Sequence, residues 1–247
     1  MFPIQAPPDF RIIAHRGASG YAPENTVPAF DLARKMGAVE IKTDTQLTTD
    51  GTVILCHDLN LDRLGHPGVV VESSSIDALR PLDLGSWFSP HLYGGTAIMT
   101  LAELFERYGD AFVYHVELKG KVETLPDAVC DVIRSAGMEE HCIITSFAYQ
   151  HLARMRKIDS DCRLGWLVGE VGEEECDRAR EIGLLQLCPR AGSVTNEMVE
   201  HSRTVVEEVR AWGLGGSGQQ VADLIHRILA AGCDGATINW PDWITRA

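Results

Sequence analysis

The sequence predicts an α/β protein, a closed (β/α)8 TIM barrel, from three observations. Short apolar or β-branched runs alternate with segments of helical period, which is typical of βα units in a parallel sheet. There are eight such runs, the number that a closed barrel needs. A length of 247 residues, with 45% apolar and 23% charged residues, suits one barrel with a large core. We therefore expect residues 1–247 to form a single domain.

The barrel strands are predicted by the short apolar or β-branched runs. In chain order they are Arg11–Ala14, Val39–Gln46, Phe112–Leu118, Cys142–Thr145, Arg163–Val168, Leu184–Leu187, Glu208–Trp212 and Ala236–Asn239. Two of the helices between them have clear signals. The first begins at a cap formed by Asn25-Thr26 and stops at Gly37. The other, Gly218–Ala231, carries an apolar stripe with the helical period of 3.6 residues.

One interval interrupts the alternation of strands and helices. After a turn at Asp50-Gly51, a short strand at Val53–Cys56 runs back along the second barrel strand. The following interval, roughly residues 59–99, is rich in Gly, Pro and Ser. Because a structureless loop of that length is uncommon in a compact domain, we expect a small ordered insertion. It is predicted to lie over the mouth of the barrel, with Trp87 and Phe88 as its anchor.

Charge and composition narrow the class of partner. An excess of 35 acidic over 22 basic residues argues against nucleic acid or an anionic membrane surface as the main partner. The first residues lack the features of a signal peptide, and no apolar run approaches the ~20 residues that span a bilayer. Seven scattered cysteines without C-x-x-C spacing are typical of reduced thiols. We expect a cytoplasmic protein without stable membrane association, of unknown oligomeric state.

Polar residues gather where the predicted strands end, which is where a (β/α)8 barrel has its active site. Residues at these ends include His15, Arg16, Lys42, Asp44, Glu117, Lys119, Ser146, Phe147, Trp212, Asn239 and Trp240. Strand alternation places Glu40, Lys42 and Asp44 on one face of the second strand, which must point into the barrel. Three inward charges are costly to bury unless they pair with one another, a metal or a ligand.

Two histidines flank this charged strand. His15 ends the first strand, and the Asp50-Gly51 hairpin aims His57 back at the second strand. Two imidazoles beside a guanidinium and carboxylates suit acid–base chemistry on an anionic substrate. Structural alternatives exist, because either histidine could be a hydrogen-bonded core or turn residue. In the same way, Arg16 and Lys119 could simply pair with neighbouring carboxylates.

Six motifs connect these residues with a known family. They are H-R-G at His15–Gly17, E-N-T at Glu24–Thr26, G-A-x-x-I-x-x-D at Gly37–Asp44, T-x-D-G-x-x-x-x-x-H-D-x-x-L-x-R at Thr48–Arg63, G-S-W-F at Gly85–Phe88 and V-E-L-K at Val116–Lys119. In this order they resemble the glycerophosphodiester phosphodiesterase family, although H-R-G alone would be a weak signal. Looser matches follow at Thr145–Phe147, Trp212 and Asp234–Asp242, so the resemblance covers nearly the whole chain.

The resemblance implies hydrolysis of a glycerophosphodiester, a small-molecule substrate of lipid metabolism, to glycerol 3-phosphate and an alcohol. His15 and His57 would be the acid–base pair, and Arg16 and Lys119 would hold the phosphate. Asp44 and Glu117 would bind a divalent cation, usually magnesium or calcium. From the residues themselves, Trp87, Phe147, Trp212 and Trp240 are candidates for an apolar wall around the alcohol, with Trp240 the predicted substrate contact.

Lys42 departs from the family pattern, which has a third carboxylate ligand at this position. The ammonium could take the place of the cation, with Asp44, Glu117 and Glu40 compensating its charge. Alternatively, Glu40 could supply the missing oxygen, or the site could have lost both metal and turnover. The last case would leave a catalytically silent barrel that binds a phosphodiester. A lysophospholipase D-type activity is a further alternative, which would need an apolar mouth.

Overall fold

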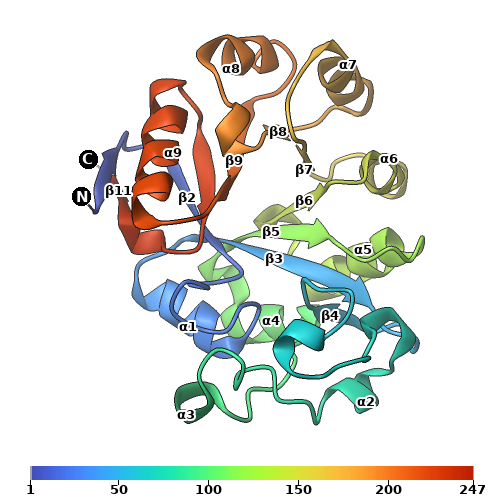
Figure 1. Cartoon of the computed structure of the whole chain (residues 1–247). Helices are drawn as coiled ribbons and strands as arrows, with labels where there is room; N and C mark the ends of the chain where they lie inside the picture. Colours follow the sequence, from blue (N-terminus) through green and yellow to red (C-terminus); the bar gives the residue numbers. More distant parts are fainter. Residues whose placement is uncertain (1, 247) are drawn as a thin grey trace.

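The computed structural model describes residues 2–246 and confirms the predicted closed barrel (Figure 1). Its parallel strands are β2 (Arg11–His15), β3 (Glu40–Leu47), β5 (Val113–Leu118), β6 (Cys142–Ser146), β7 (Leu164–Leu167), β8 (Gln186–Cys188), β9 (Glu208–Leu214) and β10 (Gly235–Ile238). Each strand begins and ends within two residues of the bounds predicted for it. The barrel closes because β2 pairs in parallel with β10 on one side and with β3 on the other.

Helices surround the barrel and cover the outer face of its strands (Figure 1). They are α1 (Val27–Lys35), α4 (Leu101–Tyr108), α5 (Leu125–Ala136), α6 (Tyr149–Ile158), α7 (Glu173–Ile182), α8 (Asn196–Ser202) and α9 (Gly218–Ala230). The two ends of the chain meet where β1 (Ile4–Ala6) pairs in parallel with β11 (Ile244–Arg246). Within the described part of the chain, no helix has the length and apolar character needed to cross a membrane.

Helix α1 begins at its predicted place but by a different mechanism. Thr26 is the N-cap residue, yet its hydroxyl donates to the carbonyl of Pro23 and accepts no hydrogen bond from the helix. Asn25 has a left-handed backbone, with φ of 56°, and turns its amide toward β3. The prediction of a side-chain cap was therefore wrong, because these two polar groups bond elsewhere.

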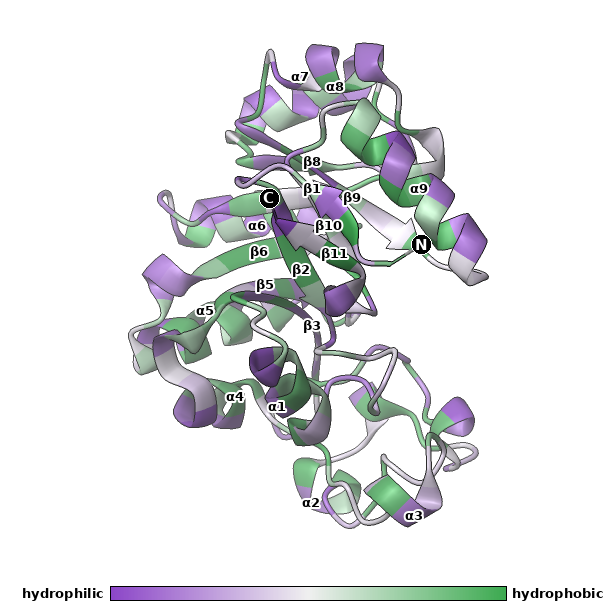
Figure 2. Ribbon diagram, turned by 90° about the vertical axis from the view of Figure 1, so that its left-hand side faces the viewer, coloured by the Kyte–Doolittle hydropathy of each residue, from purple (hydrophilic) through white to green (hydrophobic). Residues whose placement is uncertain are grey.

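The insertion at residues 59–99 is ordered, but it does not lie over the mouth of the barrel. It follows β4 (Val53–Leu55), which pairs antiparallel with β3, and contains α2 (Ile76–Leu79) and α3 (Pro90–Tyr93). Figure 2 shows α2 and α3 at one end of the molecule, beyond α1. The insertion builds its own small core from Leu61, Leu64, Val71, Leu79, Leu84 and Ile98. Trp87 packs against this core as predicted, and Phe88 packs edge-to-face on Trp87.

At the amino-terminal end of the barrel, the strands carry polar side chains on their inward faces. Arg11 pairs with both Glu40, with 2.7 Å between Nε and Oε1, and Glu208. His115 Nε2 lies 2.9 Å from the second oxygen of Glu40, and Gln186 donates to Glu208 at 2.6 Å. Both oxygens of Glu40 are therefore engaged in this group of contacts at the amino-terminal end of the barrel, the lower barrel network. Glu40 does not compensate Lys42, and it does not supply a further oxygen at the strand ends.

Candidate active site

A pocket of about 300 Å³ opens at the carboxyl ends of the barrel strands. The cationic side of its lining also carries both candidate histidines; it consists of His15, Arg16, Lys42, His57 and Lys119. The lining also contains the apolar side chains of Phe147, Leu167, Trp212 and Leu214, and Lys119 Nζ lies 5.4 Å from the centre of the Phe147 ring. An anionic group fits the cations, and a less polar group fits the apolar side chains. The structure thus brings most of the predicted site residues to one cavity.

The turn after β2 aims the first two site residues. Arg16 has a left-handed backbone with φ of 57°, and Gly17 follows at φ of 80°. The Arg16 N–H donates to the carbonyl of Lys42 at 2.7 Å, which fastens the turn to β3. A Cβ on Gly17 would lie 2.5 Å from the backbone of Ala29, so only glycine fits here. Steric fit therefore explains the glycine of the H-R-G motif.

His15 is held by an amide from the last barrel strand. Its Nδ1 lies 2.7 Å from Oδ1 of Asn239, which can only accept a hydrogen bond. The proton of a neutral His15 therefore belongs on Nδ1, and the Nε2 lone pair is free. Burial lowers the pKa of His15 well below its usual value, and the charges of Arg16 and Lys42 lower it further. His15 is suited to accept a proton.

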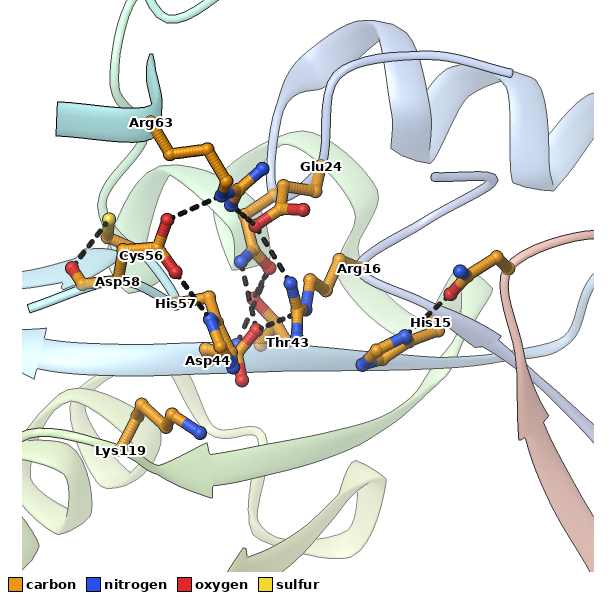
Figure 3. A network of polar contacts seen from close by, with 12 residues as sticks. His15, Arg16, Glu24, Thr43, Asp44, Cys56, His57, Asp58, Arg63 and Lys119 are labelled. Carbon is orange, nitrogen blue, oxygen red and sulfur yellow. Dashed lines mark hydrogen bonds and ion pairs between the residues drawn. The ribbon is translucent and has the colours of Figure 1, made fainter. Parts of the chain in front are cut away.

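His57 is held by a carboxylate, which favours the opposite role. Its Nδ1 lies 2.7 Å from Oδ1 of Asp58, whose second oxygen accepts a hydrogen bond from Arg63 at 2.7 Å. Arg63 also donates to Glu24, which in turn binds Arg16, so a chain of contacts crosses the rim (Figure 3). Burial and Arg16 lower the pKa of His57, while the two nearby aspartates oppose this shift.

Lys42 lies between two carboxylates inside the barrel. Its side chain is only 5% exposed, and its Nζ pairs with Asp44 and, at 2.5 Å, with Oε2 of Glu117. Asp44 also forms an ion pair with Arg16, with 2.9 Å between Oδ2 and Nε, and accepts a hydrogen bond from Asn25 Nδ2 at 3.0 Å. Burial acts to raise the pKa of Asp44, but Lys42 and Arg16 outweigh it and hold that pKa well below its usual range. Both aspartate oxygens are saturated by cationic and amide donors.

The residues present do not fit a divalent cation. The ammonium of Lys42 takes the space between Asp44 and Glu117, which the sequence predicted as cation ligands. Within residues 2–246, no group of three or more His, Cys, Asp and Glu side chains could hold a metal ion. A cation between the two carboxylates would also be repelled by the ammonium at contact distance.

Arg16 and Lys119 were predicted either to bind the phosphate or to pair with neighbouring carboxylates. Both line the pocket, and both contact carboxylates: Arg16 pairs with Asp44, and Lys119 Nζ lies 3.4 Å from Oε1 of Glu117. Their side chains keep 13% and 24% of their surface exposed, so each can still reach a bound anion. Pairing with carboxylates is thus compatible with substrate binding by the same two residues.

Trp240 lies outside the pocket, contrary to the prediction. It stacks on Trp243, with ring centroids 4.4 Å apart, and packs against Gly20. Trp87 belongs to the insertion core and also lies outside the pocket. Of the predicted apolar residues, Phe147 and Trp212 do line the pocket. Phe147 is 43% exposed, and its ring packs edge-to-face with that of Trp212, with 5.0 Å between the ring centroids.

Two residues near the pocket were not predicted to have a role. Asn25, which was taken as a helix cap, accepts from Thr43 at 2.9 Å and donates to Asp44. Arg210 lines the pocket from β9, although it is 98% buried. Strand alternation puts Arg210 on the inward face with Trp212, so this signal was available in the sequence.

Comparison with known proteins adds independent evidence. Residues 15–243 match the model of the Glycerophosphoryl diester phosphodiesterase family. A glycerophosphodiester phosphodiesterase from Caldanaerobacter subterraneus subsp. tengcongensis is 30% identical over 235 residues, covering 94% of each chain. YhdW of Bacillus subtilis is 38% identical over 149 residues, which are 60% of this chain and 61% of YhdW. An Oleispira antarctica phosphodiesterase, solved with the product sn-glycerol-3-phosphate, has the same fold, with a TM-score of 0.82 at 23% identity over 94% of both chains.

Proposed function

Because this chain belongs to the glycerophosphoryl diester phosphodiesterase family, a family of phosphoric diester hydrolases, we propose that it hydrolyses a glycerophosphodiester without a divalent cation. The products are glycerol 3-phosphate and an alcohol. The observation that carries this proposal is the ammonium of Lys42, which pairs with Asp44 and Glu117 beside the two histidines.

The phosphoryl group binds on the cationic side of the pocket. Arg16, Lys42 and Lys119 line that side, and their positive charges neutralise the non-bridging oxygens of the phosphodiester. The less polar alcohol portion then extends toward Phe147 and Trp212. This orientation keeps the anion away from the apolar side chains, where it would lose hydration without compensation.

His15 acts as the general base and His57 as the general acid. The free Nε2 of His15 takes the proton from the glycerol hydroxyl next to the phosphate, and that oxygen attacks phosphorus. The bond from phosphorus to the alcohol oxygen breaks, and protonated His57 gives that oxygen its proton. Asp58 stabilises the protonated ring. Water then opens the cyclic phosphate with the two roles reversed.

Lys42 conserves the charge of the family's metal centre. Three carboxylates with a divalent cation carry three negative and two positive charges, which leaves a net charge of −1. Lys42 with Asp44 and Glu117 carries one positive and two negative charges, which leaves the same −1. The neighbouring cations and histidines therefore experience the same net charge as they would beside a bound metal ion. The difference is that the ammonium is covalently attached and cannot exchange.

The insertion gives no support to the lysophospholipase alternative. Val70 and Leu92 are exposed at 42% and 76%, but both belong to the insertion, which contributes no residue to the described pocket lining. The silent binding protein keeps the same contacts as the enzyme, so only turnover separates these two functions.

The deciding experiment measures release of glycerol 3-phosphate from glycerophosphocholine and glycerophosphoethanolamine. The protein is assayed with added Mg²⁺ or Ca²⁺ and again with EDTA, next to its His15→Ala variant. Activity that is indifferent to EDTA and absent in His15→Ala supports the proposal. Activity abolished by EDTA would show that a cation is needed, and a folded protein without turnover would favour the binding function.

A further inference from the structure

Arg210 is a buried cation at the floor of the pocket whose charge the protein itself does not pair. It is 2% exposed, and it lines the pocket from the inward face of β9. No described carboxylate forms an ion pair with it, in contrast to Arg16 and Lys42. A guanidinium cannot lose its proton in a protein, so this charge stays in a poorly hydrated place. Such burial is costly unless a ligand compensates it.

The hydrogen-bond donors of Arg210 divide into one that is used and two that are free. Nη1 donates to the hydroxyl of Thr237 on β10. Nε and Nη2 are both buried and have no oxygen or nitrogen acceptor among the described residues, and the Cys188 thiol beside the guanidinium is only a weak acceptor. These two nitrogens form one edge of the guanidinium plane, and this edge matches two oxygens of a phosphate or carboxylate. The free donors therefore have the geometry of an oxyanion site.

The contact with Thr237 holds the guanidinium among the residues that line the pocket. Thr237 and Asn239 both line the pocket and lie two residues apart on the same side of the chain. Asn239 holds His15, so the guanidinium is fastened to the strand that positions the proposed base.

We propose that Arg210 is a substrate-binding residue whose Nε and Nη2 hold two oxygens of the phosphoryl group from the floor of the pocket. This inference rests on the proposed function. The arrangement gives the anion a second set of donors in addition to those of Arg16 and Lys119. The fixed contact with Thr237 orients the guanidinium before substrate arrives, so little side-chain freedom is lost on binding.

The test measures binding of sn-glycerol 3-phosphate by calorimetry to the wild-type protein and to Arg210→Gln. Loss of charged hydrogen bonds should weaken binding about 10- to 100-fold. Arg163→Gln is the matched control, because Arg163 lies outside the pocket and donates to the carbonyls of Glu140 and Cys142. It should leave the affinity unchanged. Equal affinity in wild type and Arg210→Gln would overturn the proposal.

Two further variants keep the test decisive if Arg210→Gln does not fold. Arg210→Lys keeps the charge but lacks the two-donor edge, and Thr237→Val removes the acceptor that orients the guanidinium. Both should weaken binding of glycerol 3-phosphate, and unchanged affinity in both would contradict the proposal.

The same variants distinguish the phosphoryl group from a second anion on the substrate. An Arg210 variant that hydrolyses glycerophosphoserine poorly but binds glycerol 3-phosphate normally would place the oxyanion on the serine carboxylate, and the phosphoryl assignment would be wrong. Because product binding is measured directly, the result can be read even if the wild-type protein hydrolyses no diester.

Discussion

Lys42 and Glu117 form a buried ion pair in the barrel, with 2.5 Å between Nζ and Oε2. The two residues come from neighbouring strands, and Glu117 is in register with Asp44, the second partner of Lys42. The ammonium and the two carboxylates thus form a triad in which the positive charge of Lys42 compensates part of the negative charge. Buried carboxylates without a compensating charge would be strongly destabilised, so the ammonium has a structural role as well as an electrostatic one.

Replacing the ammonium by a carboxylate should restore cation dependence. In Lys42→Glu, three carboxylates face one another, and their repulsion should make the protein less stable without a metal. We expect Ca²⁺ to bind this variant in calorimetry and to raise its Tm, while the wild-type Tm does not respond. A wild-type protein that binds Ca²⁺ as well as the variant does would contradict the compensated triad.

Removing the charge without adding another should mainly affect stability. Lys42→Met keeps much of the side-chain volume but leaves Asp44 and Glu117 buried beside each other without their main cation. We expect the free energy of unfolding in urea to fall by about 3–5 kcal/mol. Lys35→Met, on the exposed end of α1, is the control and should change it little. A loss below ~1 kcal/mol would mean that other groups compensate the carboxylates.

The pH dependence of kcat/KM should place the optimum on the acid side of neutrality. His15 must be neutral to act as base, so the rate falls as pH drops through its strongly lowered pKa. His57 must be protonated to act as acid, so the rate falls as pH rises through its less strongly lowered pKa. Both limits lie below the ordinary histidine value of about 6.5. A maximum above neutral pH would exclude this assignment of the two roles.

A leaving group that needs no proton should separate the two histidines. With glycerophosphocholine, His15→Ala and His57→Ala should each lose about 10²- to 10⁴-fold in kcat. With a nitrophenyl ester of glycerol phosphate, the departing nitrophenolate is stable without protonation, so His57→Ala should recover much of the rate. His15→Ala should not recover, because its base is missing. Recovery in His15→Ala alone would reverse the assignment.

The fold and half of the site followed from the sequence because strand alternation determines both. Outward apolar residues such as Ile41 and Val116 face the helices, and the inward residues that remain must meet at the strand ends. The contact of Lys42 with Asp44 follows from the same spacing, since residues two apart share a face. The direction of a side chain, into the barrel or toward the helices, was therefore predictable wherever a regular strand carries it.

The errors lie where regular strands stop. The chain leaves β10 after Ile238, so alternation no longer fixes the direction of Trp240, which stacks on Trp243 instead. The place of the insertion depends on the path after β4, which composition does not determine. Arg210 could be placed on the inward face, but its unpaired donors depend on neighbours from another strand.

The lower barrel network should make stability depend on pH through His115. Burial lowers the pKa of His115 to about 4, although the hydrogen bond that His115 donates to Glu40 opposes this shift. Between this pKa and the unfolded value of about 6.5, the unfolded chain binds a proton that the native protein does not, so stability falls as pH decreases. From pH 7 to pH 5 this contribution amounts to about 2 kcal/mol. His115→Gln keeps an N–H for Glu40 but does not titrate, so its urea unfolding free energy should lack this loss. Identical pH dependence in wild type and His115→Gln would show that burial does not shift the pKa of His115 from its value in the unfolded chain.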